Sequence, residues 1–391
     1  MKVGKSLLNS LMAFVCILAF SGQVKASQAK KRTIHVGVVL RLEDKYNNSV
    51  SEMMTGVEAA KALFEQKHPG TQIVIHRYPH TEDLSTVVAA ADKVIKDKLS
   101  AVIGGELSEE AIVLRDKLGP AKIIFITPTS SSPTVTEGFP FSFRACFSDR
   151  LVAEQLASFT FNHLKPNAVG VIHNISSPYT DFLSKEFIAN FKKEESKNSK
   201  IIPLFEEKVL GDSSDFSNQI NVFIEHKITH LVMLTHQTDL LRFALQAANK
   251  GFFPVYIGSD GWGSNENIYK KFVTDSPFAS KFEAFRNSYW KENSPTKMGL
   301  EFKNEYKRMF SHEPNAWSAI AFDTSWILFT AMNNAKDNSK GDSIREEMLK
   351  LKNTPLVTTQ NFKFGTDNSP RKDLYIYEIN KNGIHYSETL K

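Results

Sequence analysis

Residues 34–40 read Ile-His-Val-Gly-Val-Val-Leu, and the amphipathic stretch 53–64 follows them. A short β-branched run followed by an apolar pattern of helix length is the repeating unit of a parallel sheet with crossover helices. The alternation continues with apolar runs at 72–75, 101–104 and 122–126, and with helical patterns around 84–95 and from residue 108. The sequence therefore predicts an α/β fold.

A second series of the same kind begins near residue 168. Its apolar runs lie at 168–173, 201–205, 229–234 and 254–257, and its helical patterns at 181–191, 216–224 and 239–249. Two tandem arrays predict two doubly wound parallel-sheet lobes that face each other across a ligand cleft. The remaining chain predicts a helix-rich segment at 295–351 and a final β pair formed by 362–364 and 374–377, with turns at 367–368 and 381–383.

The first residues carry the pattern of a secretory signal peptide. Lys2 and Lys5 precede an apolar stretch, 7–20, and Val24-Lys25-Ala26 provides a small-x-small cleavage site. We therefore expect residues 1–26 to be a signal peptide and the mature chain to lie in the periplasm. No other segment has the apolar length of a membrane span. Cys146 is then the one cysteine left, so no intramolecular disulfide is expected.

The charge balance argues against nucleic acid as a partner. The chain has 48 Lys and Arg against 43 Asp and Glu, and three of those lysines lie in the predicted signal peptide. A nearly neutral mature chain lacks the basic surface that binds phosphate backbones. His76 and His80 are separated by Arg77-Tyr78-Pro79, where proline disfavours the helix that would set two metal ligands on one face. We therefore expect no metal site and no cofactor.

Residues 257–262 read Ile-Gly-Ser-Asp-Gly-Trp and follow the predicted strand at 254–257. In open α/β sheets, ligands bind beyond the carboxyl ends of the strands. Asp260 is therefore a candidate counter-ion for the ammonium group of a ligand. The alternative is that Asp260 only caps the next helix or turn. Trp262 is expected either to stack on the ligand or to pack beneath the loop.

Two further polar segments follow predicted strands upstream. Ser108 is expected to cap the helix at 109–117, so that its hydroxyl and the adjacent amides face a carboxylate, although capping alone is an equal alternative. The loop 129–132 offers the hydroxyl and N–H groups of Ser130 and Ser131. A site split between these serines and Asp260 holds opposite ends of a zwitterion from opposite lobes. Binding therefore requires the lobes to close.

Together these motifs resemble a known family, the type I periplasmic solute-binding proteins of branched-chain amino acid and amide transporters, called the Leu/Ile/Val-binding group. The motifs that carry the resemblance, in order along almost all of the mature chain, are 36–39, 101–105, 126–133, 258–261 and 319–323. The resemblance implies three interlobe crossings, near Phe147, Asn287 and Pro355. The lobes it implies are 27–147 plus 288–355 for the N-terminal lobe, and 148–287 plus 356–391 for the C-terminal lobe.

The resemblance also implies roles for individual residues. In similar proteins the residues that align with Ser108 and Ser131 take the ligand carboxylate, and the acid that aligns with Asp260 takes the α-ammonium. Tyr179 and His236 align with aromatic positions that shape the ligand's side of the cleft. From the residues alone, Tyr179 also fits a surface turn before a helix, and His236 also fits a helix cap.

Three acids depart from the pattern of that family. Glu106, Glu109 and Glu110 stand where small and hydroxyl residues are usual, and negative charge there opposes a ligand carboxylate unless the acids point to solvent. Arg41 is available to pair with one of them or with a carboxylate of the ligand. The sequence is therefore also compatible with a cationic or amide ligand.

Enzymatic interpretations of the sequence are weaker than a binding function. The stretch 258–262 lacks the second glycine of a nucleophile elbow, and 261–266 lacks the third glycine of a dinucleotide fingerprint. The sequence predicts a monomeric periplasmic substrate-binding protein, not an enzyme. We expect it to capture a small zwitterionic amino acid or related amide for an inner-membrane ABC permease. A ligand-sensing partner of a membrane receptor and a secreted hydrolase are the alternatives.

Overall fold

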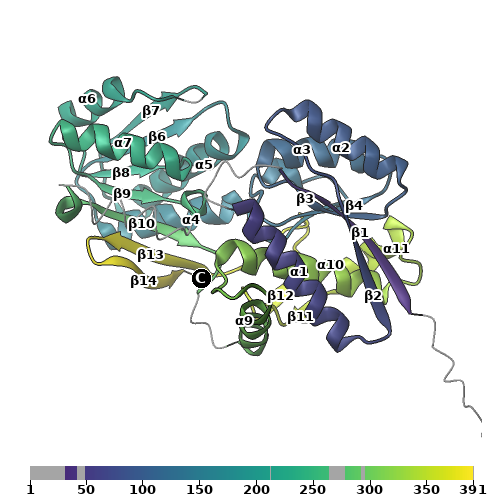
Figure 1. The fold of residues 1–391 in the computed structure, drawn as a ribbon. Helices are drawn as coiled ribbons and strands as arrows, with labels where there is room; N and C mark the ends of the chain where they lie inside the picture. The colour runs from purple at the N-terminus through teal and green to yellow at the C-terminus, as the bar shows by residue number, and fades with distance from the viewer. Residues whose placement is uncertain (1–30, 42–48, 212, 264–277, 292–295, 391) are drawn as a thin grey trace, which may run out of the picture.

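The computed structural model describes residues 31–41, 49–211, 213–263, 278–291 and 296–390. These residues form two parts, each built around one β-sheet with helices on it (Figure 1). The predicted α/β class with two parallel-rich sheets is confirmed. The predicted signal peptide, residues 1–26, lies outside the described residues. None of the described helices is long and apolar enough to cross a membrane.

The first sheet has five strands, all parallel, in the order β2-β1-β3-β4-β5. The strands are β1 Arg32–Val39, β2 Thr71–Arg77, β3 Ala101–Gly104, β4 Ile124–Thr127 and β5 Ser142–Arg144. The central strands β3 and β4 are buried throughout, as their continuous apolar runs require between two helical layers. β5 was not predicted, because three residues that include Ser and Arg give no apolar run. We call this sheet and its helices the β1–β5 lobe.

Helices cover both faces of the first sheet (Figure 1). They are α1 Ser49–Lys67, α2 Leu84–Lys96, α3 Ser108–Leu118, α9 Lys297–Phe310, α10 Ala316–Asn334 and α11 Gly341–Lys350. α1 and α10 pack together on one face, and α2 and α3 on the other. α10 is apolar around most of its circumference and almost entirely buried. Gly56 permits its close approach to α1, because a Cβ there would lie 2.3 Å from the carbonyl oxygen of Ser318.

The second sheet has seven strands in the order β14-β13-β10-β9-β8-β6-β7. The strands are β6 Val169–Asn174, β7 Leu204–Val209, β8 His230–Met233, β9 Val255–Gly258, β10 Glu283–Ser288, β13 Leu374–Asn380 and β14 Gly383–Leu390. The strands from β6 to β10 are parallel to one another, whereas β13 runs antiparallel to both of its neighbours. β7 begins later than the predicted 201–205, because Pro203 lacks an N–H group and Ile201 is exposed.

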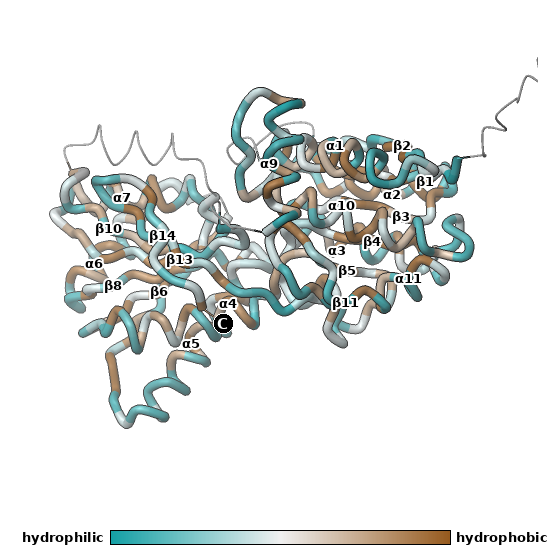
Figure 2. Tube along the Cα trace, turned by 90° about the horizontal axis from the view of Figure 1, so that it is seen from below, coloured by the Kyte–Doolittle hydropathy of each residue, from teal (hydrophilic) through white to brown (hydrophobic). Residues whose placement is uncertain are grey.

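The helices on the second sheet are α4 Asp149–Ser158, α5 Pro178–Asn198, α6 Ser217–Glu225 and α7 Gln237–Asn249. Side chains alternate across the sheet: Val169 and Val171 of β6 pack in the cluster that includes α4 and α5, and Ile172 in the cluster that includes α6 and α7. We call this part the β6–β10 lobe. Figure 2 shows the two lobes side by side.

The C-terminal strands differ from the prediction. β12 Phe362–Lys363 pairs with β11 Lys352–Thr354, and β13 pairs with β14 rather than with 362–364. The side chain of Asn368 donates to the carbonyl oxygens of Phe139 and Ser142, at 3.0 and 3.1 Å. This contact holds the chain against the first sheet beyond the predicted crossing near Pro355. The division into lobes at 147, 287 and 355 stays a prediction, and the contact favours a later third crossing.

Candidate functional site

A cavity lies between the two lobes, at the carboxyl ends of the parallel strands. It holds about 480 Å³ of empty space, its open mouth included. It is lined by Glu106, Leu107, Ser108, Glu109, Thr129, Ser130, Ser131, Ser177, Tyr179, His236, Asp260, Gly261 and Trp317. The cavity thus brings together all six residues predicted from the sequence. Their role in ligand binding stays a prediction.

The serine loop after β4 forms part of the first wall, and hydrogen bonds fix it to the loop after β3. The hydroxyls of Thr127 and Ser130 both donate to the carbonyl oxygen of Gly105, at 2.7 and 2.8 Å. Thr129 donates in the same way to the carbonyl of Glu106, at 2.8 Å. Gly105 has a φ of 67°, a conformation that favours glycine, so the turn after β3 depends on this residue. The polar groups of this wall are therefore held in place before any ligand arrives.

A buried cation lies behind the serine loop. Arg144, at the end of β5, is fully buried and donates to the carbonyl oxygens of Ser130 and Ser132, at 3.0 and 2.6 Å. Burial lowers the pKa of its guanidinium, although that of an arginine stays far above neutral pH. Because the Arg144 guanidinium binds two carbonyl oxygens of the loop, it stabilises the conformation of the loop backbone. Its positive charge also favours an anionic group on the cavity side of the loop.

Ser108 lies on the same wall, but its local role differs from the prediction. It is the first residue of α3, and Leu107 occupies the capping position. The Ser108 hydroxyl accepts a hydrogen bond of 3.4 Å from the N–H of Ser132 instead of capping the helix. The expected cap is therefore wrong, because the helix begins one residue earlier than predicted. The side chain still lines the cavity, almost fully buried.

The opposite wall comes from the β6–β10 lobe. Tyr179 stands in the first turn of α5, and its hydroxyl forms a short hydrogen bond with that of Ser259. Gly261 allows this approach, since a Cβ there would lie 2.9 Å from the Tyr179 hydroxyl oxygen. His236 immediately precedes α7, and its ring centroid is 5.9 Å from that of Tyr179. Both predicted aromatic positions therefore form one surface of the cavity.

Asp260 follows β9 and begins a short 3-10 turn, Asp260–Trp262. Its side chain is 6% exposed, and the side-chain amide of Asn287 donates to it at 3.5 Å. Burial raises the pKa of the Asp260 carboxyl to about 6, although the Tyr289 hydroxyl and Asn287 partly offset that effect. The group is therefore mostly ionised at neutral pH in a nearly dry setting. A buried carboxylate of this kind provides a counter-ion for a cation.

Asp149 was not predicted as a site residue, yet it lies directly behind the cavity wall. It is fully buried at the start of α4, and its N–H donates to the carbonyl of Ser131 at 3.0 Å. Neither carboxyl oxygen of Asp149 forms a hydrogen bond of normal length with another described residue. Burial raises the pKa of Asp149 to about 8, the Ser131 hydroxyl lowers it in part, and the charge of Asp260 raises it further. In the empty protein, Asp149 therefore holds a proton at neutral pH.

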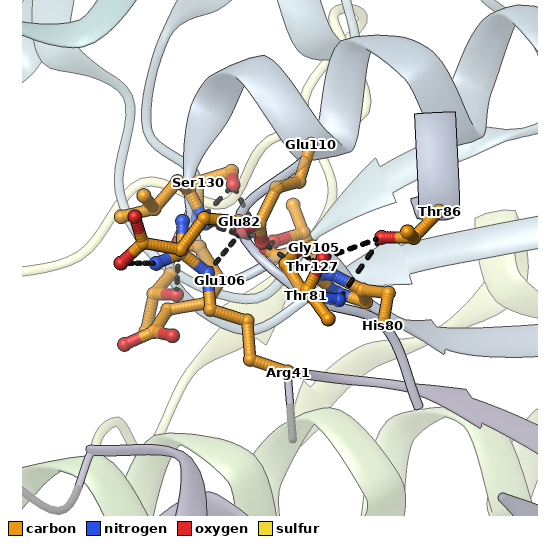
Figure 3. Close-up of polar contacts among 12 residues, drawn as sticks. Arg41, His80, Thr81, Glu82, Thr86, Gly105, Glu106, Glu110, Thr127 and Ser130 are labelled. Carbon is orange, nitrogen blue, oxygen red and sulfur yellow. Dashed lines mark hydrogen bonds and ion pairs between the residues drawn. The ribbon is translucent and has the colours of Figure 1, made fainter. Parts of the chain in front are cut away.

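The three acids around α3 have different environments, and Figure 3 labels two of them, Glu106 and Glu110. Glu110 is buried and accepts a hydrogen bond of 2.5 Å from Arg41 Nε, so Arg41 pairs with one of these acids. His80 lies on the other side of the same carboxylate, with its Nε2 atom 3.9 Å away. Glu106 and Glu109, in contrast, line the cavity. Glu106 is 5% exposed and accepts a short hydrogen bond from the Ser49 hydroxyl.

Two tryptophans near the cavity have different positions. Trp262 is fully buried and its indole N–H donates to the carbonyl of Met233 at 3.1 Å, so it packs beneath the loop and does not line the cavity. Trp317, in the first turn of α10, does line the cavity. No sequence pattern pointed to Trp317, because the start of α10 is distant from every strand end along the chain. Among the described residues, no group of three His, Cys, Asp or Glu side chains is arranged to hold a metal ion.

Two parallel-rich sheets with a polar cavity between them define a solute-binding protein of the two-lobe type. The chain belongs to the periplasmic binding protein family, whose sequence profile matches residues 33–384. This is a family of binding proteins and not of enzymes. The resemblance identified from the sequence is therefore confirmed.

Individual relatives are distant in sequence. The Leu/Ile/Val-binding protein of Escherichia coli (strain K12) is 24% identical over 261 residues, which cover 66% of this chain and 67% of that protein. The crystal structure of a leucine-binding protein from Thermotoga maritima superposes with a TM-score of 0.81 at 19% identity, and the match covers 92% of this chain and 99% of that chain. A branched-chain amino acid transporter substrate-binding protein from Streptococcus pneumoniae, in complex with isoleucine, superposes with a TM-score of 0.79 at 18% sequence identity. That match covers 92% of this chain and 100% of the other chain. These structural likenesses show the fold.

Proposed function

We propose that this protein is a periplasmic substrate-binding protein that captures a small amino acid or related amide and delivers it to an inner-membrane ABC permease. The observation that carries the proposal is the chemistry of the two cavity walls. Hydroxyl and amide groups around Ser108 and Ser131 lie on one wall, and the buried carboxyl of Asp260 lies on the other. The relative from Escherichia coli, named for its binding of leucine, isoleucine and valine, supports an amino acid ligand.

The proposed binding mode assigns each end of a zwitterion to one wall. The ligand carboxylate accepts hydrogen bonds from the Ser108 and Ser131 hydroxyls and from loop N–H groups, with Arg144 behind the loop favouring the negative charge. The ligand ammonium donates to Asp260, where most of the solvent is excluded. Ser130 is the exception among the predicted residues, because its hydroxyl is used to donate to Gly105. It positions the loop.

Binding and delivery both follow from the split between the lobes. Neither wall alone can satisfy both charges of a zwitterion, so the ligand stabilises a closed arrangement of the lobes more than an open one. A closed lobe pair presents a surface that a permease can distinguish from the empty protein. Sensing by a membrane receptor would use the same change and is the second candidate. The hydrolase alternative is set aside because the family is one of binding proteins.

Native mass spectrometry of freshly purified mature protein, followed by calorimetric titration with the twenty amino acids and their amides, tests the proposal. We expect a retained or added mass of amino acid size and saturable binding of at least one member of the set. A bound molecule without an ammonium group, or no binding across the whole set, would contradict the amino acid assignment. Recovery of the ligand unchanged after incubation separates a binding protein from a hydrolase.

A further inference from the structure

We propose that Arg144 makes the cavity select a ligand carboxylate over the corresponding carboxamide. This inference rests on the proposed binding of an amino acid or amide and narrows its substrate class to free acids. Arg144 is fully buried at the end of β5, behind the serine loop, residues 129–132. Its guanidinium forms no ion pair with any Asp or Glu of the described residues. Because buried charges in proteins are usually paired, an arginine in this setting favours a negative group nearby.

The hydrogen bonds of the guanidinium satisfy several of its donors but leave its charge in place. Their acceptors are all neutral, namely the carbonyl oxygens of Ser130 and Ser132 and the hydroxyl of Thr136, the last at 2.9 Å. The Nε atom has no hydrogen-bond partner among the described residues. Because neutral acceptors do not cancel a charge, the field of Arg144 extends through the loop to its cavity side, where Ser131 lines the wall.

The ionisable groups that act most strongly on Arg144 are Cys146 and Asp149, and both are fully buried. Burial raises the pKa of the Cys146 thiol to about 12 and that of the Asp149 carboxyl to about 8. At neutral pH, the thiol is therefore uncharged, and the carboxyl mostly so, in the empty protein. Asp367 and Glu137 act more weakly on Arg144, and both are partly exposed, so solvent screens them.

A carboxylate bound at the serine loop would supply the negative charge that Arg144 lacks. A carboxamide has almost the same shape but carries no net charge, so it gains little of this attraction. The positive end of the α3 dipole acts in the same direction, because Ser108 in its first turn lines the cavity. The carboxyl groups of Glu106 and Glu109 lie on the same wall and oppose a carboxylate, so matched ligands are needed to measure the balance.

Matched acids and amides separate the charge of the ligand from its shape. The twenty amino acids and their α-carboxamides are titrated calorimetrically at about pH 6.5, where the α-ammonium of both forms is charged. We expect every amino acid that binds to do so at least about ten-fold more tightly than its amide, because charge-assisted contacts exceed neutral ones. A smaller ratio overturns this inference and leaves the proposed function intact. No binding across the whole set overturns both.

Variants of Arg144 separate its charge from its support of the loop. Arg144→Met removes the charge and fills much of the same space, whereas Arg144→Lys keeps the charge and loses part of the hydrogen bonding. In Arg144→Met we expect the ratio of acid affinity to amide affinity to fall at least about five-fold. In Arg144→Lys the ratio should stay within about two-fold of the wild-type value, even where both affinities fall. A purely structural role would weaken acid and amide equally in both variants, and an unchanged ratio in Arg144→Met overturns the assignment.

Arg150→Met is the matched control for the loss of one positive charge. Arg150 lies in the first turn of α4, its side chain is 51% exposed, and it pairs with Glu137 at 2.9 Å. Its replacement should leave the ratio unchanged because solvent screens this charge. An equal fall of the ratio in Arg150→Met would assign the preference to net charge and overturn the role of Arg144. If thermal unfolding shows that Arg144→Met does not fold, loss of the ratio in Arg144→Lys is the overturning result.

Discussion

Replacing Asp260 by Asn tests the charge on which the proposed binding mode depends. Asn keeps the size and hydrogen-bonding shape of the side chain but removes its negative charge. Because Asp260 is only 6% exposed, a ligand ammonium beside it is largely removed from water. Losing the charge of one partner in such a pair costs about 2–5 kcal/mol. We therefore expect the affinity for an amino acid to fall about 30-fold to several thousand-fold at pH 7.5.

The pH of the assay matters because burial raises the pKa of Asp260 to about 6. At pH 7.5 Asp260 is mostly ionised, so its negative charge is present for a ligand ammonium in the wild type. The raised pKa also predicts the effect on stability. A carboxyl whose folded pKa exceeds its unfolded value stabilises the fold at low pH, and this contribution is lost as pH rises through the folded pKa. Asp260→Asn should therefore not lower the melting temperature at neutral pH.

Calorimetric titration gives the affinity, and thermal unfolding of the same samples gives the stability. Asp215→Asn is the matched control: Asp215 is exposed, belongs to the β6–β10 lobe, and accepts a hydrogen bond from Ser217 N–H at 2.9 Å. It should bind as the wild type does. Near-wild-type affinity of Asp260→Asn would refute the ammonium-binding role. The role of Asp260 would then be to form the turn after β9. A parallel loss of affinity and melting temperature would point to a damaged fold instead.

Three further outcomes follow from the structure. Small-angle scattering should give a smaller radius of gyration with a bound amino acid than without, and unchanged scattering at saturation would contradict lobe closure. Affinity should rise between pH 6 and 8, because a ligand ammonium favours the ionised form of Asp149, whose pKa is raised to about 8 by burial. Binding heats measured in two buffers of different ionisation enthalpy should therefore reveal that the protein releases a proton on binding. The Asp149→Asn variant should not show this proton release. A fall in affinity over that interval would oppose this coupling. Reductant and chelator should leave affinity unchanged, because Cys146 is fully buried with its pKa raised to about 12, whereas a large loss with chelator would indicate a metal.

The order of strands and helices could be predicted because each unit is a separate pattern in the sequence. The apolar run at 34–40 and the amphipathic stretch at 53–64 correspond to β1 and α1, and α1 extends beyond the predicted stretch at both ends. Elements without an apolar run were missed. β14 has few apolar residues because it lies at the edge of the second sheet, and its pairing with β13 depends on a register that no local pattern gives.

The site was predictable to the extent that it lies at strand ends. Ser108, Ser131 and Asp260 each follow a strand, and the rule that ligands bind there was sufficient to select them. Asp149 and Trp317 stand at the starts of α4 and α10, where they read as ordinary first-turn residues. Their places beside the cavity depend on how the chain passes between the lobes, which is a tertiary property.

The proton on Asp149 gives the empty cavity a way to tolerate two neighbouring acids. If both Asp149 and Asp260 were ionised without a ligand, two buried like charges would repel each other. Holding one proton, the pair carries about one negative charge at neutral pH, as the pKa values of about 8 and about 6 imply. A ligand ammonium beside Asp260 can favour the loss of that proton through its positive charge. A neutral ligand of the same shape cannot, so the pair favours ammonium ligands through the difference between the empty and occupied states.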